Sequence, residues 1–536
     1  MKRLILLFSI LMSLSALNAQ VKSPADIKVL QENAEKANEA LYRSHDFVQG
    51  WLTKCDPVSG LIPRNLVDSP YWNAQDAAAD NYPFMVLTTF FTDKDLFEGK
   101  MFDMLNSEIK LTSKMGPCPA SYSFKTHSFL EKDLNVGNII FGSAEYMKDG
   151  LLPLTEWLGE SPWSDRMISI LDGLKEITKG EPVTKIEGEY FGGHQEIEVS
   201  GDLLQVLSRV YWMTGNKDYL DWAEKIADHY LLDEKHFITN EDNLRLRDHG
   251  GEIVLGLCEF YATLHYVNPE KKAQYKNALY AVLDRILRYG RNEHGMFYDE
   301  FSPKTGKVIA KSLADTWGYI LDGFYTVYLV DHHQPYHDAV VILLCNLKDH
   351  YQHYNWEVNS SDGIADAVES ALNLYNREPM NSVAQWIDTE IASMFAKQQS
   401  TGIIEGWHGD GNFARTAIMY ALWKTKGCFV SNWNRNLFFG AEMRKGGKLS
   451  VWLDSKVDDW KGELYFDRAR HKENLHLPLD WTRINQFPEW FTVDPKETYQ
   501  VTINGKKKKY SGKKLSKGLS LSVKVGSPKL IEVIKL

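Results

Sequence analysis

The stretch Tyr219-Leu220-Asp221-Trp222-Ala223-Glu224-Lys225-Ile226-Ala227 shows the pattern on which the fold depends. Its apolar residues recur at three- and four-residue spacing and its charged residues fall on the opposite face, which indicates an amphipathic helix lying on a core. The same pattern recurs along the chain, so we expect seven outer helices. These are residues 24–51, 92–111, 162–179, 217–232, 269–289, 334–350 and 381–398.

A second kind of helix alternates with the first. It is apolar on most sides and opens with polar or glycine-rich residues, which indicates burial within the fold. The loops before these helices vary in length and are rich in Gly, His, Asp, Trp and Asn, so they favour a closed α/α toroid of six or seven hairpins over an open solenoid. The expected inner helices are residues 79–91, 137–158, 196–213, 250–266, 314–330, 363–375 and 412–425.

The pattern changes to that of strands after Gly427. Alternation as in Leu519-Ser520-Leu521-Ser522-Val523, with turn signals such as Asn504-Gly505 between the segments, predicts antiparallel strands. The fold class is therefore mainly α, with a small C-terminal β-sandwich-like domain. The expected divisions are a signal peptide at 1–19, a toroidal domain at 20–427 and the β domain at 428–536.

The N-terminus predicts export. Met1-Lys2-Arg3 is followed by an apolar run at 4–14 and a small, polar stretch that ends near Ala19, the expected cleavage site of a signal peptide. No other segment is apolar enough to span a membrane, so we expect a periplasmic or secreted protein. Of the five cysteines, Cys55 and Cys118 lie in loop-like segments and could pair in an oxidising compartment.

Charge and aromatic content narrow the classes of ligand. The formal net charge of −10 argues against a general nucleic-acid binder. The four lysines at 506–509 indicate a solubilised turn or sheet edge, with a contact to an acidic glycan as the alternative. The 16 Trp and 26 Tyr exceed the needs of a helical core, and such rings often stack on sugars.

Two inner helices open with clusters of ionisable residues. In Gly192-Gly193-His194-Gln195-Glu196 the carboxylate enters the start of a buried helix, where the helix dipole favours it and an apolar wall can raise its pKa toward that of a general acid. Arg247-Asp248-His249-Gly250-Gly251-Glu252 repeats the arrangement one hairpin later. The alternative for both is helix capping.

Further helix openings add to this set, and only closure of a ring would bring them together. We predict Glu196, Glu252, His194 and Asp248 as catalytic residues. No metal, ATP or NAD motif is present, so no cofactor is expected. The predicted substrate-binding residues are Arg64, Asp80, Asn81, Arg247, His249, Asp315, Trp317, Trp407 and His408.

With its repeats and the opening at residues 193–198, the chain from about Asp26 to Trp490 resembles the six-hairpin glycosidase-like superfamily of α/α toroids. That superfamily includes unsaturated glucuronyl hydrolases, and toroids joined to β domains are common among polysaccharide lyases. More narrowly, the chain looks like Bacteroidetes glycoside hydrolase family 154, whose described activity is β-glucuronidase. The seven hairpins depart from the usual six, so an end pair could lie outside the ring.

Three functions remain open. The first is a glycoside hydrolase acting on an acidic, uronic-acid-containing glycan, with Glu196 and Glu252 as acid and base or nucleophile in a positively charged pocket. The second is a polysaccharide lyase that uses His194, His249 or a Tyr as base. The third is a non-catalytic glycan-binding protein.

Overall fold

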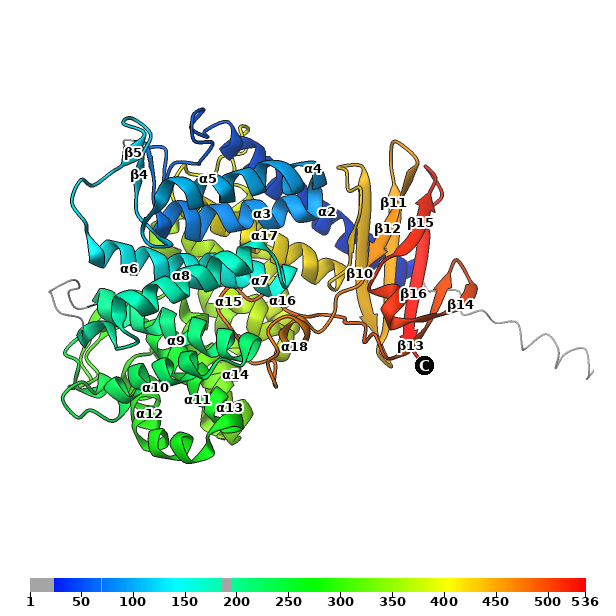
Figure 1. Cartoon of the computed structure of the whole chain (residues 1–536). Helices are drawn as coiled ribbons and strands as arrows, with labels where there is room; N and C mark the ends of the chain where they lie inside the picture. Colours follow the sequence, from blue (N-terminus) through cyan, green and yellow to red (C-terminus); the bar gives the residue numbers. More distant parts are fainter. Residues whose placement is uncertain (1–23, 69, 186–193) are drawn as a thin grey trace, which may run out of the picture. The chain divides into compact units, whose positions relative to one another are not determined.

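The computed structural model describes residues 24–68, 70–185 and 194–536, and the fold is mainly helical (Figure 1). The predicted signal peptide lies outside the described residues. The chain forms two compact units. The helical unit comprises Ala40–Tyr420 and Ala469–Trp490, and the second unit comprises Ala421–Arg468, Phe491–Leu536 and the described residues before Ala40. The segment 469–490, expected in the β domain, thus belongs to the helical unit.

The outer helices bury one face each, and the part of α2 before Ala40 does so within the second unit. In α10, for example, Tyr219, Trp222 and Ile226 are buried while the charged residues between them face outward. The described outer helices are α2 (Pro24–Leu52), α4 (Lys94–Leu96) with the π-helical η2 (Phe97–Met101) and α5 (Phe102–Thr112), α8 (Pro162–Thr178), α10 (Lys217–Leu231), α12 (Pro269–Tyr289), α14 (Gln334–Tyr351) and α16 (Asn381–Phe395).

The inner helices alternate with the outer ones, as the sequence predicts. They are the π-helical η1 (Ala74–Asn81) with α3 (Tyr82–Thr92), then α6 (Val136–Glu145), the π-helical η3 (Tyr146–Leu151) and α7 (Leu152–Leu158), then α9 (His194–Thr214), α11 (His249–Val267), α13 (Trp317–Asp331), α15 (Ser361–Arg377) and α17 (Asp410–Thr425). Seven outer and seven inner positions are thus filled in the described part of the chain.

The inner helices form a closed ring. Neighbours touch in chain order through α6, α9, α11, α13 and α15. The hydroxyl of Thr416 in α17 donates to the carbonyl of Ala365 in α15. Gly411 of α17 lies so close to η1 that an added Cβ would come within 1.9 Å of the Asp80 carbonyl oxygen, so α17 closes the ring onto η1. The prediction of an α/α toroid is confirmed, and all seven inner positions found in the described residues belong to this ring.

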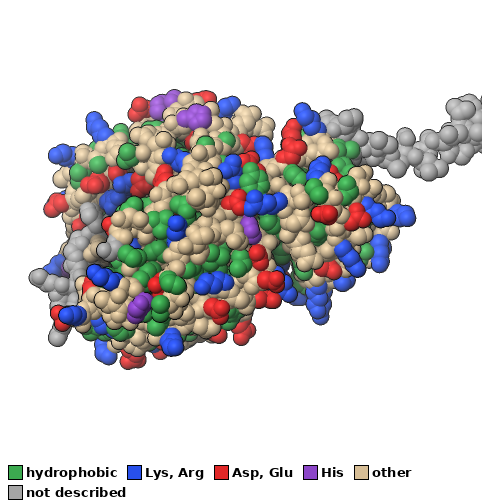
Figure 2. Space-filling view, turned by 90° about the horizontal axis from the view of Figure 1, so that it is seen from above, with side chains coloured by type: hydrophobic (Ala, Val, Ile, Leu, Met, Phe, Trp, Pro, Cys, Tyr) green, Lys and Arg blue, Asp and Glu red, His purple; other side chains and the backbone are tan. Residues whose placement is uncertain are grey.

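The second unit contains two antiparallel sheets, which confirms the predicted C-terminal β fold. One sheet has the order β10-β11-β16-β13-β14 and the other β15-β12-β9. The lysines at 506–509 lie exposed on β14, an edge strand, and basic side chains gather on this unit in Figure 2. The strands are β9 (Phe429–Val430), β10 (Leu437–Arg444), β11 (Lys448–Ser455), β12 (Trp460–Tyr465), β13 (Thr498–Ile503), β14 (Lys506–Ser511), β15 (Leu519–Val523) and β16 (Lys529–Lys535).

The segment 469–490 fills the ring where the inner helices end. Arg483 is fully buried, and its Nη2 donates to Glu156 of α7 at 2.7 Å. The Trp481 indole donates to Glu259 of α11, and the Thr482 hydroxyl donates to the Asp322 carbonyl of α13. These contacts join the segment to α7, α11 and α13.

Two smaller predictions have plain outcomes. Cys55 and Cys118 are both free thiols. Among the described helices, none combines the length and the apolar character that crossing a bilayer requires.

Candidate functional site

An open cavity of about 720 Å³ lies at the beginnings of the inner helices. Every inner position of the ring contributes to it, and Asn485 of the segment 469–490 reaches it as well. The expected convergence of the helix openings is therefore seen for Asp80, Asp248 and Asp315. The lining residues are Asp80, Glu145, Lys148, Asp149, Glu198, Asp248, Glu252, Asp315, Thr316, Tyr319, Glu357, Asp362, Asp366, His408, Asn412, Arg415 and Asn485.

A buried lysine organises one wall. Lys148 Nζ lies 2.8 Å from Asp149 Oδ2, 2.7 Å from Glu252 Oε1 and 3.5 Å from Asp202 Oδ1. Burial would lower the pKa of Lys148, but these carboxylates raise it well above its usual value. Burial raises the pKa of Glu252 to about 8, although Lys148 opposes the shift. The cluster is a buried ion-pair network in which, among the described residues, the charge of Lys148 alone compensates the three carboxyls that it contacts.

Glu252, a predicted catalytic residue, has neither oxygen free. Its Oε1 contacts Lys148, and its Oε2 accepts a hydrogen bond from Gln205 Nε2 at 2.7 Å. The residue is only 3% exposed. This geometry is that of an anchor between α9 and α11.

A second wall carries an imidazole between carboxylates. His408 Nδ1 lies 3.5 Å from Asp80 Oδ2 and 4.0 Å from Asp76 Oδ1. Burial would lower the pKa of His408, but Asp80 raises it to about 9. Burial raises the pKa of Asp80 to about 7, against the effect of His408. Arg64 lies 2.8 Å from Asp76 Oδ2 and 5.9 Å from the centre of the Trp407 ring, outside the cavity lining.

The third wall places four carboxyls within 4.0 Å of the Arg247 guanidinium, those of Asp248, Asp299, Asp315 and Glu357. Arg247 Nε lies 4.0 Å from Asp248 Oδ2, and Arg247 Nη1 lies 3.8 Å from Asp315 Oδ2. Asp315 is buried, and burial together with the charge of Asp248 raises its pKa well above the usual value. The side chain of Asp248 is 43% exposed.

The backbone of Asp248 is unusual. Its φ of 54° and ψ of −105° lie outside the regions that side-chain-bearing residues favour, and such strain persists where the surroundings impose it. Its amide donates to the Thr316 hydroxyl, and Arg245 Nη2 lies 3.2 Å from its carboxylate. These contacts fix the carboxylate at the mouth of the cavity.

The floor is a hydrogen-bonded network around Arg415. This buried guanidinium donates to Asp366 Oδ1 at 2.6 Å, to Asn485 Oδ1 at 2.7 Å and to Asn412 Oδ1 at 3.0 Å. Asn412 in turn donates to Asp362. The network joins α15 and α17 to the segment 469–490, so this segment shapes the cavity.

The prediction of a positively charged pocket is wrong for this lining. Ten of the lining residues are Asp or Glu, whereas Lys148, Arg415 and His408 are the basic ones. Burial raises the pKa of several of these carboxyls, including Glu198 to about 8, because crowding in a poorly solvated space disfavours the charged form.

The other predicted site residues lie as follows. Glu196 is not in the cavity lining, and its electrostatic neighbour is Glu241, whereas Glu198 does line the cavity. Asn81 is fully buried, and its amide has no hydrogen-bond partner in the described part of the chain. Trp317 is 0% exposed and has no face for a sugar ring, whereas Trp407 is 39% exposed beside His408. The side chains of His194 and His249 lie outside the described residues.

Several lining residues were not predicted from the sequence. Glu145, Lys148 and Asp149 interrupt an apolar helix, and this interruption was a usable signal. Two of the three described π-helical segments carry charged groups of the cavity, since η1 holds Asp80 and η3 holds Lys148, and π-helical turns often occur at functional sites. The segment that carries Asn485 gave no helical signal.

One group at the site has the composition of a metal site. The ligand atoms of Asp76, Asp80 and His408 lie within 4.8 Å of one another. Arg64 already pairs with Asp76, and the raised pKa of His408 favours its protonated form, which cannot bind a metal. The geometry is that of an ion-pair network.

Comparisons with known proteins give distant structural neighbours. No protein-family model and no curated protein matches the chain. A family 76 glycoside hydrolase from a bovine Bacteroides thetaiotaomicron strain matches with 14% identity and a TM-score of 0.42, over 59% of this chain and 76% of that one. A possible family 105 member from Salmonella enterica has 15% identity, a TM-score of 0.38 and coverages of 53% and 82%. Cellobiose 2-epimerase from Bacillus thermoamylovorans has 11% identity, a TM-score of 0.37 and coverages of 52% and 86%.

Proposed function

We propose that the protein is a glycoside hydrolase in which Asp315 is the general acid and Asp248 the nucleophile or base. The observation that carries this proposal is that, among the four carboxyls within 4.0 Å of the Arg247 guanidinium, Asp315 is buried and Asp248 half-exposed, and both line the cavity of the ring. Hydrolysis of a glycosidic bond needs two such carboxyls in different protonation states.

The roles follow from the two environments. The raised pKa of Asp315 favours its protonated form, which can donate the proton to the leaving glycosidic oxygen. Asp248 faces solvent beside Arg245, which balances the carboxylate charge, and it attacks the anomeric carbon or activates a water. Arg247 contacts both and holds them in register as positive charge develops on the sugar ring.

We propose further that the sugar cleaved here is uncharged. A uronate would bring its carboxylate among the ionised members of ten lining carboxyls. A β-glucuronidase, the activity implied by the narrower family resemblance, is the second candidate. It is favoured by one observation, the protonated His408 at the cavity wall beside the exposed Trp407.

Matched substrates separate these candidates. The test uses a panel of aryl glycosides that includes the β-glucoside and the β-glucuronide. These two substrates differ only in the carboxylate, so the ratio of their kcat/KM values reports on the preferred charge of the sugar. Asp248→Asn and Asp315→Asn should each lower kcat/KM about 10³-fold on any hydrolysed substrate, with little change in Tm. Asp338→Asn, on an exposed carboxyl outside the cavity, is the control.

Three results would overturn the assignment. Near-wild-type turnover in both variants would remove these two residues from the chemistry. Ultraviolet absorbance from a conjugated double bond on uronic-acid polymers, with no new reducing ends on saturated neutral glycans, would establish the polysaccharide lyase. Binding of glycans without either product would favour the non-catalytic alternative.

Export of the protein is also a proposal, resting on the basic and apolar residues at 1–14. N-terminal sequencing of the protein recovered from periplasm or medium tests it. A mature chain beginning at Gln20 is the expected result, and an intact Met1 in a cytoplasmic fraction would contradict it.

A further inference from the structure

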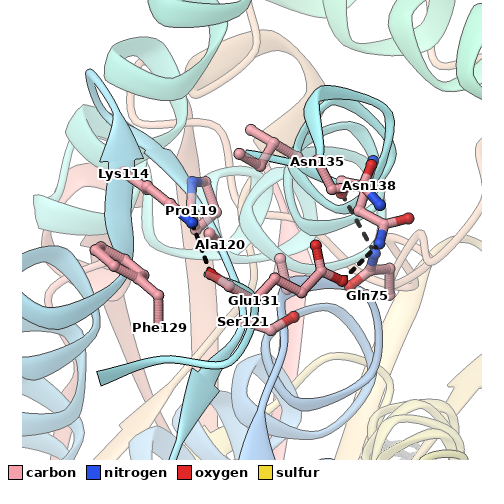
Figure 3. Close-up of a pocket in the computed structure, with 11 residues that line it drawn as sticks. Gln75, Lys114, Pro119, Ala120, Ser121, Phe129, Glu131, Asn135 and Asn138 are labelled. Atoms are coloured by element: carbon pink, nitrogen blue, oxygen red, sulfur yellow. Dashed lines mark hydrogen bonds between the residues drawn. The ribbon is translucent and has the colours of Figure 1, made fainter. Parts of the chain in front are cut away.

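A second hollow of about 360 Å³ lies on the helical unit, beside the start of η1 (Figure 3). None of its residues belongs to the lining of the ring cavity. The lining consists of Ala74, Gln75, Lys114, Pro119, Ala120, Ser121, Phe129, Glu131, Asn135, Asn138 and Ile139.

Internal contacts build the wall of this hollow. Lys114 Nζ donates to the Glu131 carbonyl at 2.9 Å and lies 4.9 Å from the centre of the Phe129 ring. Asn138 Nδ2 donates to Glu131 Oε1 at 3.1 Å, and Gln75 donates to the Asn138 carbonyl. The wall therefore holds its shape without a ligand, which reduces the entropy lost on binding.

The chemistry of the wall suits a neutral polyol. Glu131 Oε2 and the Ser121 hydroxyl have no hydrogen-bond partner in the described part of the chain, so both can bond to a hydroxyl group. Phe129 is half-buried and offers an apolar face of the kind that packs on a sugar ring. Lys114 and Glu131 balance each other, so the hollow carries no net charge to attract or repel an ion.

The hollow and the ring cavity share one helix. Gln75 of η1 lines the hollow, whereas Asp80 of the same helix lines the ring cavity. Both positions lie within the single π-helix η1, five residues apart. Asp76, between them, lies 4.0 Å from His408 of the cavity wall.

We propose that this hollow is a distal subsite that binds a neutral sugar unit of the oligosaccharide cleaved in the ring cavity. The proposal rests on the proposed function for its role in catalysis, but sugar binding itself can be measured without turnover. The subsite explains how a chain longer than the cavity would be held, with Phe129 stacking on one ring and Glu131 accepting from its hydroxyls.

The binding test uses saturation-transfer difference NMR with methyl α-mannoside, methyl β-glucoside and methyl β-galactoside. Phe129→Ala should reduce the saturation of at least one glycoside about fivefold, while Asp315→Asn should leave that signal unchanged. Tyr266→Ala, which removes an exposed ring elsewhere on the helical unit, is the matched control and should behave as wild type. Failure of all three glycosides to show a Phe129-dependent signal would overturn the subsite.

The kinetic test separates the subsite from the proposed function. Phe129→Ala and Glu131→Gln should lower kcat/KM about tenfold on a tetrasaccharide, equivalent to about 1.4 kcal/mol, and leave an aryl monoglycoside within about twofold of wild type. Equal losses on both substrates would show that Phe129 only supports the fold. Phe129-dependent binding by a protein that hydrolyses nothing would reject the proposed function and keep the sugar site.

Discussion

Replacement of Lys148 tests the electrostatics of the cavity wall most directly. Lys148→Met keeps the aliphatic stem and removes the cation that contacts Asp149, Asp202 and Glu252. Removal of one partner from a buried ion pair costs about 3–5 kcal/mol, because the other charge remains buried without compensation. For a cooperative unit of about 400 residues, a loss of 4 kcal/mol lowers Tm by about 4–5 °C.

The pH dependence of this loss identifies its cause. Burial already raises the pKa of Glu252 to about 8, and loss of Lys148 raises it further. At pH 5 the carboxyls take up protons in the folded state, so the loss should shrink to about 1 kcal/mol. At pH 8 the loss should be larger, and it should keep growing as the pH rises further, because Glu252 ionises in the wild type only near pH 8. Addition of Glu252→Gln to the variant should recover part of the stability at pH 8.

Thermal unfolding followed by circular dichroism at both pH values measures these effects, and the four-variant cycle gives the coupling between Lys148 and Glu252. The reasoning would be refuted by a loss of equal size at pH 5 and pH 8. In that case the contribution of Lys148 would come from packing of its stem.

Three other predictions concern the ring and its carboxyls. Gly411→Ala would drive a Cβ into the Asp80 carbonyl and should lower Tm and activity together, whereas Gly99→Ala, which meets nothing within 4 Å, should change neither. Burial raises the pKa of Glu198 from 4.5 to about 8, so the folded state retains a proton that the unfolded state loses. The stability of the wild type therefore falls as the pH rises from 5 to 8. Glu198→Gln removes this fall, so the Tm of the variant minus the Tm of the wild type should increase from pH 5 to pH 8. Trp317→Ala should cost about 3–5 kcal/mol in urea unfolding because that ring is fully buried, whereas Trp407→Ala should cost less than about 1 kcal/mol and show its effect in KM.

The sequence predicts the ring because helical periodicity is a local signal. The alternation between amphipathic segments such as α10 and apolar ones such as α11 is visible without any knowledge of contacts. The openings at Asp80, Asp248 and Asp315 were found for the same reason, since polar residues at the start of a buried helix point to the end of the ring that faces solvent.

The other features of the site depend on tertiary packing, which no local sequence pattern predicts. Whether Glu196 or Glu198 faces the cavity is set by the rotation of α9, and a shift of two residues turns the side chain through about 200°. Trp317 and Trp407 both lie at polar helix openings in the sequence, yet Trp317 is enclosed by the ring and Trp407 is exposed. Asn485 follows segments with strand-like alternation, so only tertiary contacts show that its segment returns to the helices.

The insertion of residues 469–490 into the ring has a consequence for biosynthesis. Glu156 leaves the ribosome 327 positions ahead of Arg483, the guanidinium that donates to both of its carboxylate oxygens. Throughout that interval the nascent helices carry an acidic group whose counterion has not yet been translated. The toroid therefore cannot reach its final state as each hairpin emerges, and its folding is completed only after strands β9 to β12, which precede the segment, have been made. Export in an unfolded state would suit such a chain, because its last structural component is among the last to be synthesised.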